Sequence, residues 1–194
     1  MLAPYGEHSA WARIVLAASV GAFVVGEVSR ALRVRHGAAR INLRAEMLFR
    51  AMFFGGILLL PAGRAVTPGA TIGGPWLFAL GVVIGWLGLL LRWWAFVTLG
   101  KYFTVVVTTS EDQPVVDSGP YRVLRHPSYT GLLLAVAGCG LMFGNWVGTA
   151  GAVVVISIAL IYRLRIEERA LIAELGNRYR DFAASRARLI PHVW

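Results

Sequence analysis

The sequence predicts an all-α integral membrane protein: a bundle of five transmembrane helices followed by a C-terminal cytoplasmic amphipathic helix. Of its 194 residues, 57% are hydrophobic and only 15% are charged, whereas a globular domain carries about 25% charged residues. Asp, Glu, Lys and Arg are absent from residues 65–91 and from residues 126–162. Because a bilayer core needs about 20 apolar residues per helix, the first run accommodates one span and the second accommodates two. A soluble domain and a disordered chain are both excluded.

Three spans are expected in the N-terminal region, residues 1–99. The first covers about residues 10–32 and is expected to be retained. Its start has only one basic residue, Arg13, which is opposed by Glu7, and no clean small-residue cleavage site follows. A strongly basic connection leads to the second span, about residues 45–62, which should end near Pro61. A loop rich in Gly, Pro and Thr separates it from the third span, about residues 75–99.

The second region, residues 100–194, is expected to carry the chemistry. Residues 100–126 are polar and rich in helix breakers, which predicts an ordered loop. A helical hairpin, residues 127–162, should contain spans four and five and turn at Gly144-Asn145, a pair suited to the left-handed conformation. Charged residues return from position 163 onward, so residues 163–194 should form the amphipathic helix and a short tail.

The distribution of basic residues predicts the orientation. Fifteen of the 19 Lys and Arg residues follow spans one, three and five, and only Arg13 and Arg64 lie on the opposite side. By the positive-inside rule the N-terminus is outside and the C-terminus is cytoplasmic. The Arg- and Ala-rich composition is typical of a bacterium, which suggests the inner membrane. Anionic lipid headgroups explain the net charge of +9, so membrane lipids are expected partners and nucleic acid is not.

Two familiar kinds of site are excluded by the residue inventory. The single cysteine, Cys139, rules out a disulfide framework and a CxxC metal site, and no metal is expected. A GxGxxG motif after a strand is absent, which rules out a soluble Rossmann-type methyltransferase.

Two polar segments on the predicted cytoplasmic side are candidates for a functional site. In residues 113–129, Arg125 and His126 precede the start of span four, whose free N–H groups would suit an anionic or carboxylate group. An interfacial belt of basic and aromatic residues is the alternative. In the second segment, Arg163 and Glu167 share one helical face. The alternative is that these two residues form only a surface salt bridge. Because spans four and five form a hairpin, both segments should face each other across the start of span four.

These segments resemble a known family. Residues 118–131 read Ser-Gly-Pro-Tyr-Arg-Val-Leu-Arg-His-Pro-Ser-Tyr-Thr-Gly, and residues 163–168 read Arg-Leu-Arg-Ile-Glu-Glu. Leu-Gly-Asn-Arg-Tyr at 175–179 and Arg-Leu-Ile-Pro at 188–191 follow. Together they are similar to the isoprenylcysteine carboxyl methyltransferase family, over about residues 99–191. The number of expected spans agrees with the five-span prokaryotic members.

The resemblance implies transfer of a methyl group from S-adenosyl-L-methionine to the carboxylate of a lipid-modified cysteine, without a metal. Arg163 matches the arginine that this family assigns to the acceptor carboxylate. The apolar run 105–107 stands where the family has a polar side chain. The cofactor contacts that the resemblance implies are Gln113, Pro114, Val115, Val116, Tyr121, His126, Pro127, Ser128, Tyr129 and Glu167.

Several alternatives remain open at this point. An NADPH-dependent membrane sterol or enone reductase shares an Arg-His-Pro-x-Tyr-x-Gly element, and a non-catalytic lipid-binding membrane subunit would need no chemistry at all. The lipophilic acceptor is equally open among an isoprenoid acid, a prenylcysteine, a phospholipid and a phenolic lipid. A carboxylate is already ionised at pH 7 and needs no base, whereas a phenol would need one, for which His126 is the nearest candidate. The oligomeric state is not specified by the sequence.

Overall fold

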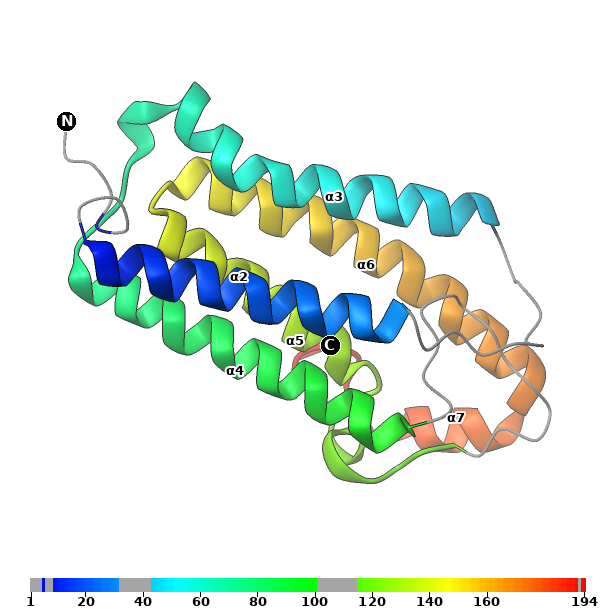
Figure 1. Cartoon of the computed structure of the whole chain (residues 1–194). Coiled ribbons are helices and arrows are strands. Elements are labelled where there is room, and N and C mark those ends of the chain that lie inside the picture. Colours follow the sequence, from blue (N-terminus) through cyan, green and yellow to red (C-terminus); the bar gives the residue numbers. More distant parts are fainter. Residues whose placement is uncertain (1–4, 6–8, 32–42, 101–114, 192) are drawn as a thin grey trace.

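A computed structural model describes residues 5, 9–31, 43–100, 115–191 and 193–194. Regular structure in these segments is helical, and the long helices run side by side along one bundle axis (Figure 1). The helices in chain order are α2 (Ala10–Ala31), α3 (Leu43–Val66), α4 (Pro75–Leu99), α5 (Pro127–Phe143), α6 (Trp146–Leu175) and α7 (Asn177–Ala184), with short 3-10 turns η1 (Pro68–Ala70) and η3 (Gly119–Arg122). This arrangement confirms the all-α prediction.

Four of these helices, α2, α3, α4 and α6, are long and apolar enough to cross a bilayer. The fifth apolar helix, α5, has 17 residues, at the lower limit of about 17 for a spanning helix. The chain is therefore an integral membrane protein of helices, and five complete spans remain a prediction.

The second span was expected to end near Pro61, and this prediction is wrong because α3 continues through Pro61 to Val66. The proline removes one backbone hydrogen bond. Breaking the helix in an apolar environment would leave further backbone groups without partners. A proline rule taken from soluble helices therefore places the end of this span too early.

The expected boundary between span five and a separate charged helix at Arg163 is also wrong. Helix α6 runs without a break for 30 residues and ends at Leu175. Gly176 follows with φ 56°, in the left-handed region that favours glycine. The break thus lies 13 residues later than the return of charge suggested, and the first charged turns of α6 extend the spanning helix.

The hairpin between α5 and α6 turns as predicted. Gly144 has φ 69° and ψ 33°, the left-handed conformation expected of a residue that ends a helix. Asn145 caps α6 by accepting a hydrogen bond of 2.8 Å from the Gly148 N–H, and its amide donates to the Thr67 carbonyl at 2.9 Å. This residue therefore also ties the hairpin to the end of α3.

Helix α4 packs closely on α5 because glycines line their contact. A Cβ added to Gly131 would lie 2.6 Å from the Gly88 carbonyl oxygen, and one added to Gly81 would lie 2.8 Å from the Gly138 carbonyl oxygen. On its other side, α5 shares the main apolar core with α3 and α6. The buried residues of this core are Leu60, Leu132, Val136, Ala152, Ile156 and Leu160.

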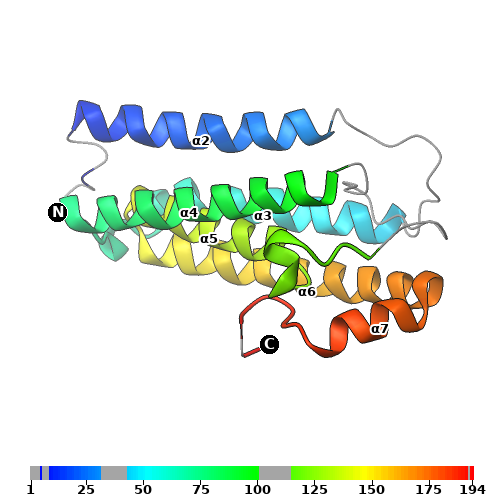
Figure 2. The same cartoon turned by 90° about the horizontal axis from the view of Figure 1, so that it is seen from below.

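Helix α2 lies to one side of the layer that contains α3, α4, α5 and α6 (Figure 2). An ion pair fastens it near one end. Arg92 of α4 binds Glu27 through two hydrogen bonds of 2.6 and 2.9 Å, and a third donor of the same guanidinium reaches the Ser128 carbonyl at 2.8 Å. Arg92 thereby connects α2 and α4 to the start of α5, where the candidate site begins.

Candidate functional site

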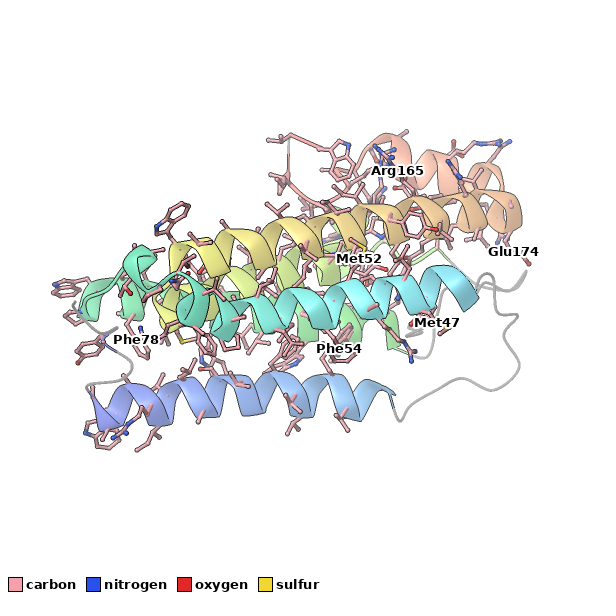
Figure 3. All side chains as sticks on the ribbon, turned by 90° about the horizontal axis from the view of Figure 1, so that it is seen from above. Met47, Met52, Phe54, Phe78, Arg165 and Glu174 are labelled. Atoms are coloured by element: carbon pink, nitrogen blue, oxygen red, sulfur yellow. The ribbon has the colours of Figure 1, made fainter. Side chains whose placement is uncertain are left out.

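One end of the bundle gathers the start of α3, the start of α5, the last turns of α6 and the tail. Figure 3 labels Met47 of α3 and Arg165 of α6 at this end, on opposite sides of the paired helices. Both of these side chains are exposed, whereas Glu46 and Arg163, in the seam between the same two helices, are only 7% and 8% exposed. Charged groups are thus buried where the two helices meet.

Arg163 and Glu167, predicted to share a helical face, are connected through the phenol of Tyr129. Arg163 donates a hydrogen bond of 3.0 Å from Nε to the Tyr129 hydroxyl, and this hydroxyl donates one of 2.6 Å to Glu167 Oε2. The Arg163 side chain is buried, which excludes the reading of a simple surface salt bridge. Tyr129 therefore places a guanidinium and a carboxylate on either side of one hydroxyl group.

Glu46 is a member of this network that the sequence reasoning missed. Its Oε2 atom lies 2.7 Å from Arg163 Nη1, and its Oε1 atom lies 2.8 Å from Arg50 Nε. The Phe49 ring covers the Arg163 guanidinium at 4.5 Å, a cation–π contact. The sequence did contain a signal, because an acidic residue inside a membrane helix suggests a functional site by itself.

A second charged cluster surrounds Glu168, the other acid of the Glu-Glu pair. Its Oε1 atom lies 3.1 Å from Arg125 Nη1 and 3.4 Å from His126 Nε2, and its Oε2 atom lies 3.1 Å from Arg188 Nε. His126 Nδ1 lies 3.9 Å from Glu167 Oε2, and the His126 ring stacks on Tyr129 at 5.4 Å. His126 therefore lies between the two acidic residues. Its proximity to Glu167 was expected, because a short hairpin joins α5 and α6.

The tail holds the loop before α5 through its backbone. The Arg125 N–H donates to the Ala187 carbonyl at 2.8 Å, and the His126 N–H donates to the Arg188 carbonyl at 3.1 Å. Thr130 adds a side-chain hydrogen bond of 2.7 Å to the Leu189 carbonyl. The Arg-Leu-Ile-Pro segment thus fixes the approach to the site, a role that its sequence alone did not indicate.

The start of α5 offers fewer free donors than expected. Pro127 has no N–H, and the N–H groups of Tyr129 and Thr130 both donate to the His126 carbonyl, at 3.0 and 3.3 Å. The four groups expected to be free belong to residues 126–129. Because the His126 N–H donates to the Arg188 carbonyl at 3.1 Å, only the Ser128 N–H of these four lacks a backbone partner among the described residues. The helix start therefore has fewer free N–H donors than the four expected, and an anion site there stays a prediction.

Of the remaining predicted cofactor residues, some pack in an apolar cluster, some are buried at the start of α5, and two lie outside the described residues. Val115, Val116 and Tyr121 pack into an apolar cluster with Tyr179 and neighbouring side chains of α6 and α7. Pro127 is fully buried, and Ser128 is 6% exposed. Gln113 and Pro114, like the apolar run 105–107, lie outside the described residues.

The hydroxyl of Tyr179 is buried and has no hydrogen-bond partner among the residues that the structure describes. Burial raises the pKa of this phenol, and the negative charges of Glu168 and Glu167 raise it further. The hydroxyl therefore stays protonated beside these two carboxylates. It is a buried polar group whose satisfaction requires a partner from outside the described residues.

Comparisons with known proteins bear on this arrangement. The family model described as the isoprenylcysteine carboxyl methyltransferase (ICMT) family matches residues 79–173. The chain is similar to this family over that segment. It is 32% identical to protein-S-isoprenylcysteine O-methyltransferase A of Arabidopsis thaliana over 120 residues, 61% of each chain. It is 34% identical to the mouse protein-S-isoprenylcysteine O-methyltransferase over 122 residues, 61% of this chain and 42% of the mouse chain.

A solved structure of the eukaryotic intramembrane Ras methyltransferase ICMT has the same fold, with a TM-score of 0.63 at 22% identity. The similarity covers 92% of this chain and 67% of that chain. The matched part of the plant relative is about three fifths of its length. The residues matched to the ICMT family include Arg163, Tyr129 and Glu167 but not Glu46, so one partner of the buried arginine comes from outside the matched segment.

Proposed function

We propose that the chain is a membrane methyltransferase that uses S-adenosyl-L-methionine to methylate the carboxylate of a lipophilic, isoprenoid-bearing acceptor. The observation that carries this proposal is the Arg163–Tyr129–Glu167 network, in which one hydroxyl joins a buried cation to a partly exposed carboxylate. The names of the similar plant and mouse proteins, O-methyltransferases of protein S-isoprenylcysteine, support the reaction class and the substrate class.

The two sides of this network suit the two reactants. S-adenosyl-L-methionine supplies a methyl group on a positively charged sulfur. Glu167, with 31% of its side chain exposed, would attract the cationic part of this cofactor, and Arg163 would hold the acceptor carboxylate. The carboxylate is already anionic at pH 7, so its oxygen attacks the methyl carbon as the carbon–sulfur bond breaks, and no proton is removed. The protein contributes alignment of the two groups and exclusion of water.

The chemistry of the surrounding groups fits the cofactor. Tyr179 offers a buried hydroxyl without a partner among the described residues. The nearby apolar cluster of Val115, Val116 and Tyr121 would cover the less polar parts of a nucleoside. Cationic Arg125 and Arg188 lie beside Glu168 and would compensate a carboxylate on the ligand.

The location of the site follows from the charge distribution. The arginine-rich segments after α2, α4 and α6 would lie in the cytoplasm, with the N-terminus outside, in a bacterial inner membrane. The cofactor would reach the site from the cytosol, and the acceptor would enter from the bilayer with its apolar tail among the helices.

Cofactor binding and methyl transfer test this proposal separately. Calorimetry on the detergent-solubilised chain should detect S-adenosylhomocysteine and not NADPH. Labelled S-adenosyl-L-methionine should then transfer its methyl group to N-acetyl-S-farnesyl-cysteine in an alkali-labile ester linkage. Binding of NADPH alone would support the reductase reading. Binding of neither nucleotide would support a non-catalytic lipid-binding subunit.

A further inference from the structure

Glu46 connects two arginines that differ in their surroundings. Its Oε2 atom contacts Arg163, whose side chain is 9% exposed, and its Oε1 atom contacts Arg50, whose side chain is 53% exposed. The carboxylate itself is 7% exposed and lies in the first turn of α3, where the helix dipole favours a negative charge. One acidic group is therefore shared between a buried cation and a solvated one.

The contacts of Arg163 restrict how a second carboxylate could bind it. A guanidinium receives a carboxylate at two points through Nη1 and Nη2, or through Nε and Nη2. Nη1 is bonded to Glu46 and Nε is bonded to Tyr129. An acceptor carboxylate that binds this guanidinium therefore competes with Glu46 for its positive charge.

Of the two partners Glu46 and Tyr129, Glu46 can leave Arg163 at the lower cost. Displacing Tyr129 would also disturb its hydrogen bond to Glu167. Glu46, by contrast, keeps Arg50 at 2.8 Å when it releases Arg163, so its charge is not left buried without compensation.

We propose that Glu46 is a specificity-determining residue of the acceptor site, an internal carboxylate that occupies Arg163 until the anionic head of the acceptor replaces it. This inference rests on the proposed function, because it assumes that Arg163 receives the acceptor. It adds that α3, outside the segment matched to the family, sets how tightly an anionic acceptor binds. Neutral head groups cannot replace a carboxylate on Arg163 and are disfavoured.

Two substitutions in this ion chain should change acceptor affinity in opposite directions. Glu46→Gln removes the competing charge and keeps an oxygen for Arg163, so the dissociation constant of an anionic acceptor should fall by about tenfold, the effect of about 1.4 kcal/mol. Arg50→Gln removes the cation that stays bound to Glu46 when Glu46 releases Arg163, so the dissociation constant of the anionic acceptor should rise. Loss of packing alone would weaken binding in both variants.

The experiment measures binding of N-acetyl-S-farnesyl-cysteine and of its carboxamide, in the presence of S-adenosylhomocysteine, to the solubilised full chain. Arg64→Gln, at the far end of α3, is the matched charge control and should match the wild type. The carboxamide should bind more weakly and equally in all variants. Unchanged or weaker binding of the acid to Glu46→Gln overturns the inference, as does wild-type protein that does not prefer the acid to the carboxamide. Failure of the proposed function would instead appear as absent S-adenosylhomocysteine binding or absent methyl transfer in the wild type.

Discussion

The hydroxyl of Tyr129 donates a hydrogen bond of 2.6 Å to Glu167 Oε2 and accepts one of 3.0 Å from Arg163 Nε. A residue at the start of α5 thereby sets the separation of two charged side chains one turn apart on α6. Since each hydrogen bond to a charged group contributes about 1.5–3 kcal/mol, this phenol controls the geometry on both sides of the proposed reaction.

Replacing Tyr129 with Phe should uncouple the two charges while keeping the ring that stacks on His126. We expect turnover to fall by about tenfold to a hundredfold, the equivalent of one such hydrogen bond, with a smaller loss of S-adenosylhomocysteine affinity. Steady-state kinetics and calorimetry measure the two effects. Wild-type turnover in Tyr129→Phe would mean that the phenol is only a packing group.

The ion pair between Glu27 and Arg92 should be important for stability. Arg92→Met removes three hydrogen bonds, leaves Glu27 without its cation and frees the Ser128 carbonyl. We expect a loss of about 2–3 kcal/mol in the free energy of unfolding, reduced from the value for a fully buried pair because a third of the Glu27 side chain is exposed. Denaturation in detergent measures this loss.

A second substitution separates the charge effect from packing in this pair. The double variant Glu27→Met with Arg92→Met should recover much of the lost stability, because no unpaired charge then remains. Arg13→Met, an exposed position on the same α2 helix, is the control and should change little. A double variant that is less stable than Arg92→Met would contradict this account.

The contact between α4 and α5 should not tolerate a side chain at Gly131. An added Cβ would lie 2.6 Å from the Gly88 carbonyl oxygen and 2.7 Å from the Arg92 N–H nitrogen, so Gly131→Ala should separate the helices and cost about 1–3 kcal/mol. Gly55→Ala, where nothing lies within 4 Å, should be neutral or stabilising through helix propensity. Equal unfolding midpoints for the two variants would show that the glycines do not set this contact.

The Tyr179 hydroxyl has no hydrogen-bond partner among the described residues, so Tyr179→Phe should stabilise the unliganded protein. Removing a buried polar group without a partner gains about 1 kcal/mol, whereas affinity for S-adenosylhomocysteine should fall if the cofactor supplies the missing partner. Thermal unfolding with and without the ligand measures both effects. Tyr162→Phe, at an exposed position of α6, should change neither. A less stable Tyr179→Phe would indicate a partner within the protein.

The apolar helices were the most predictable part of the structure. The bounds of α4 and α5 agree with those predicted, because charge-free runs and a Pro or Gly at each end mark them locally. The errors at Pro61 and Arg163 have one cause. Local rules for helix ends come from water-exposed helices, whereas here the surrounding helices and lipid favour continuation.

The sequence predicted some contacts of the candidate site and missed others, because some depend on how distant helices pack. Contacts between neighbouring helix ends, such as His126 with Glu167, follow from the short hairpin that joins α5 and α6. The contact of Glu46 with Arg163 joins residues 117 positions apart and depends on how α3 packs on α6. No local pattern encodes that packing, although a lone acid in an apolar helix indicates that some partner is needed.

The most direct test of the central claim compares S-adenosylhomocysteine binding and methyl transfer in Glu167→Ala and Arg163→Ala. Glu167 is proposed to face the cofactor and Arg163 the acceptor, so Glu167→Ala should weaken cofactor binding by at least about tenfold. Arg163→Ala should retain wild-type cofactor binding and lose turnover. Equal loss of cofactor affinity in both variants would contradict this division and would make the two residues a structural pair.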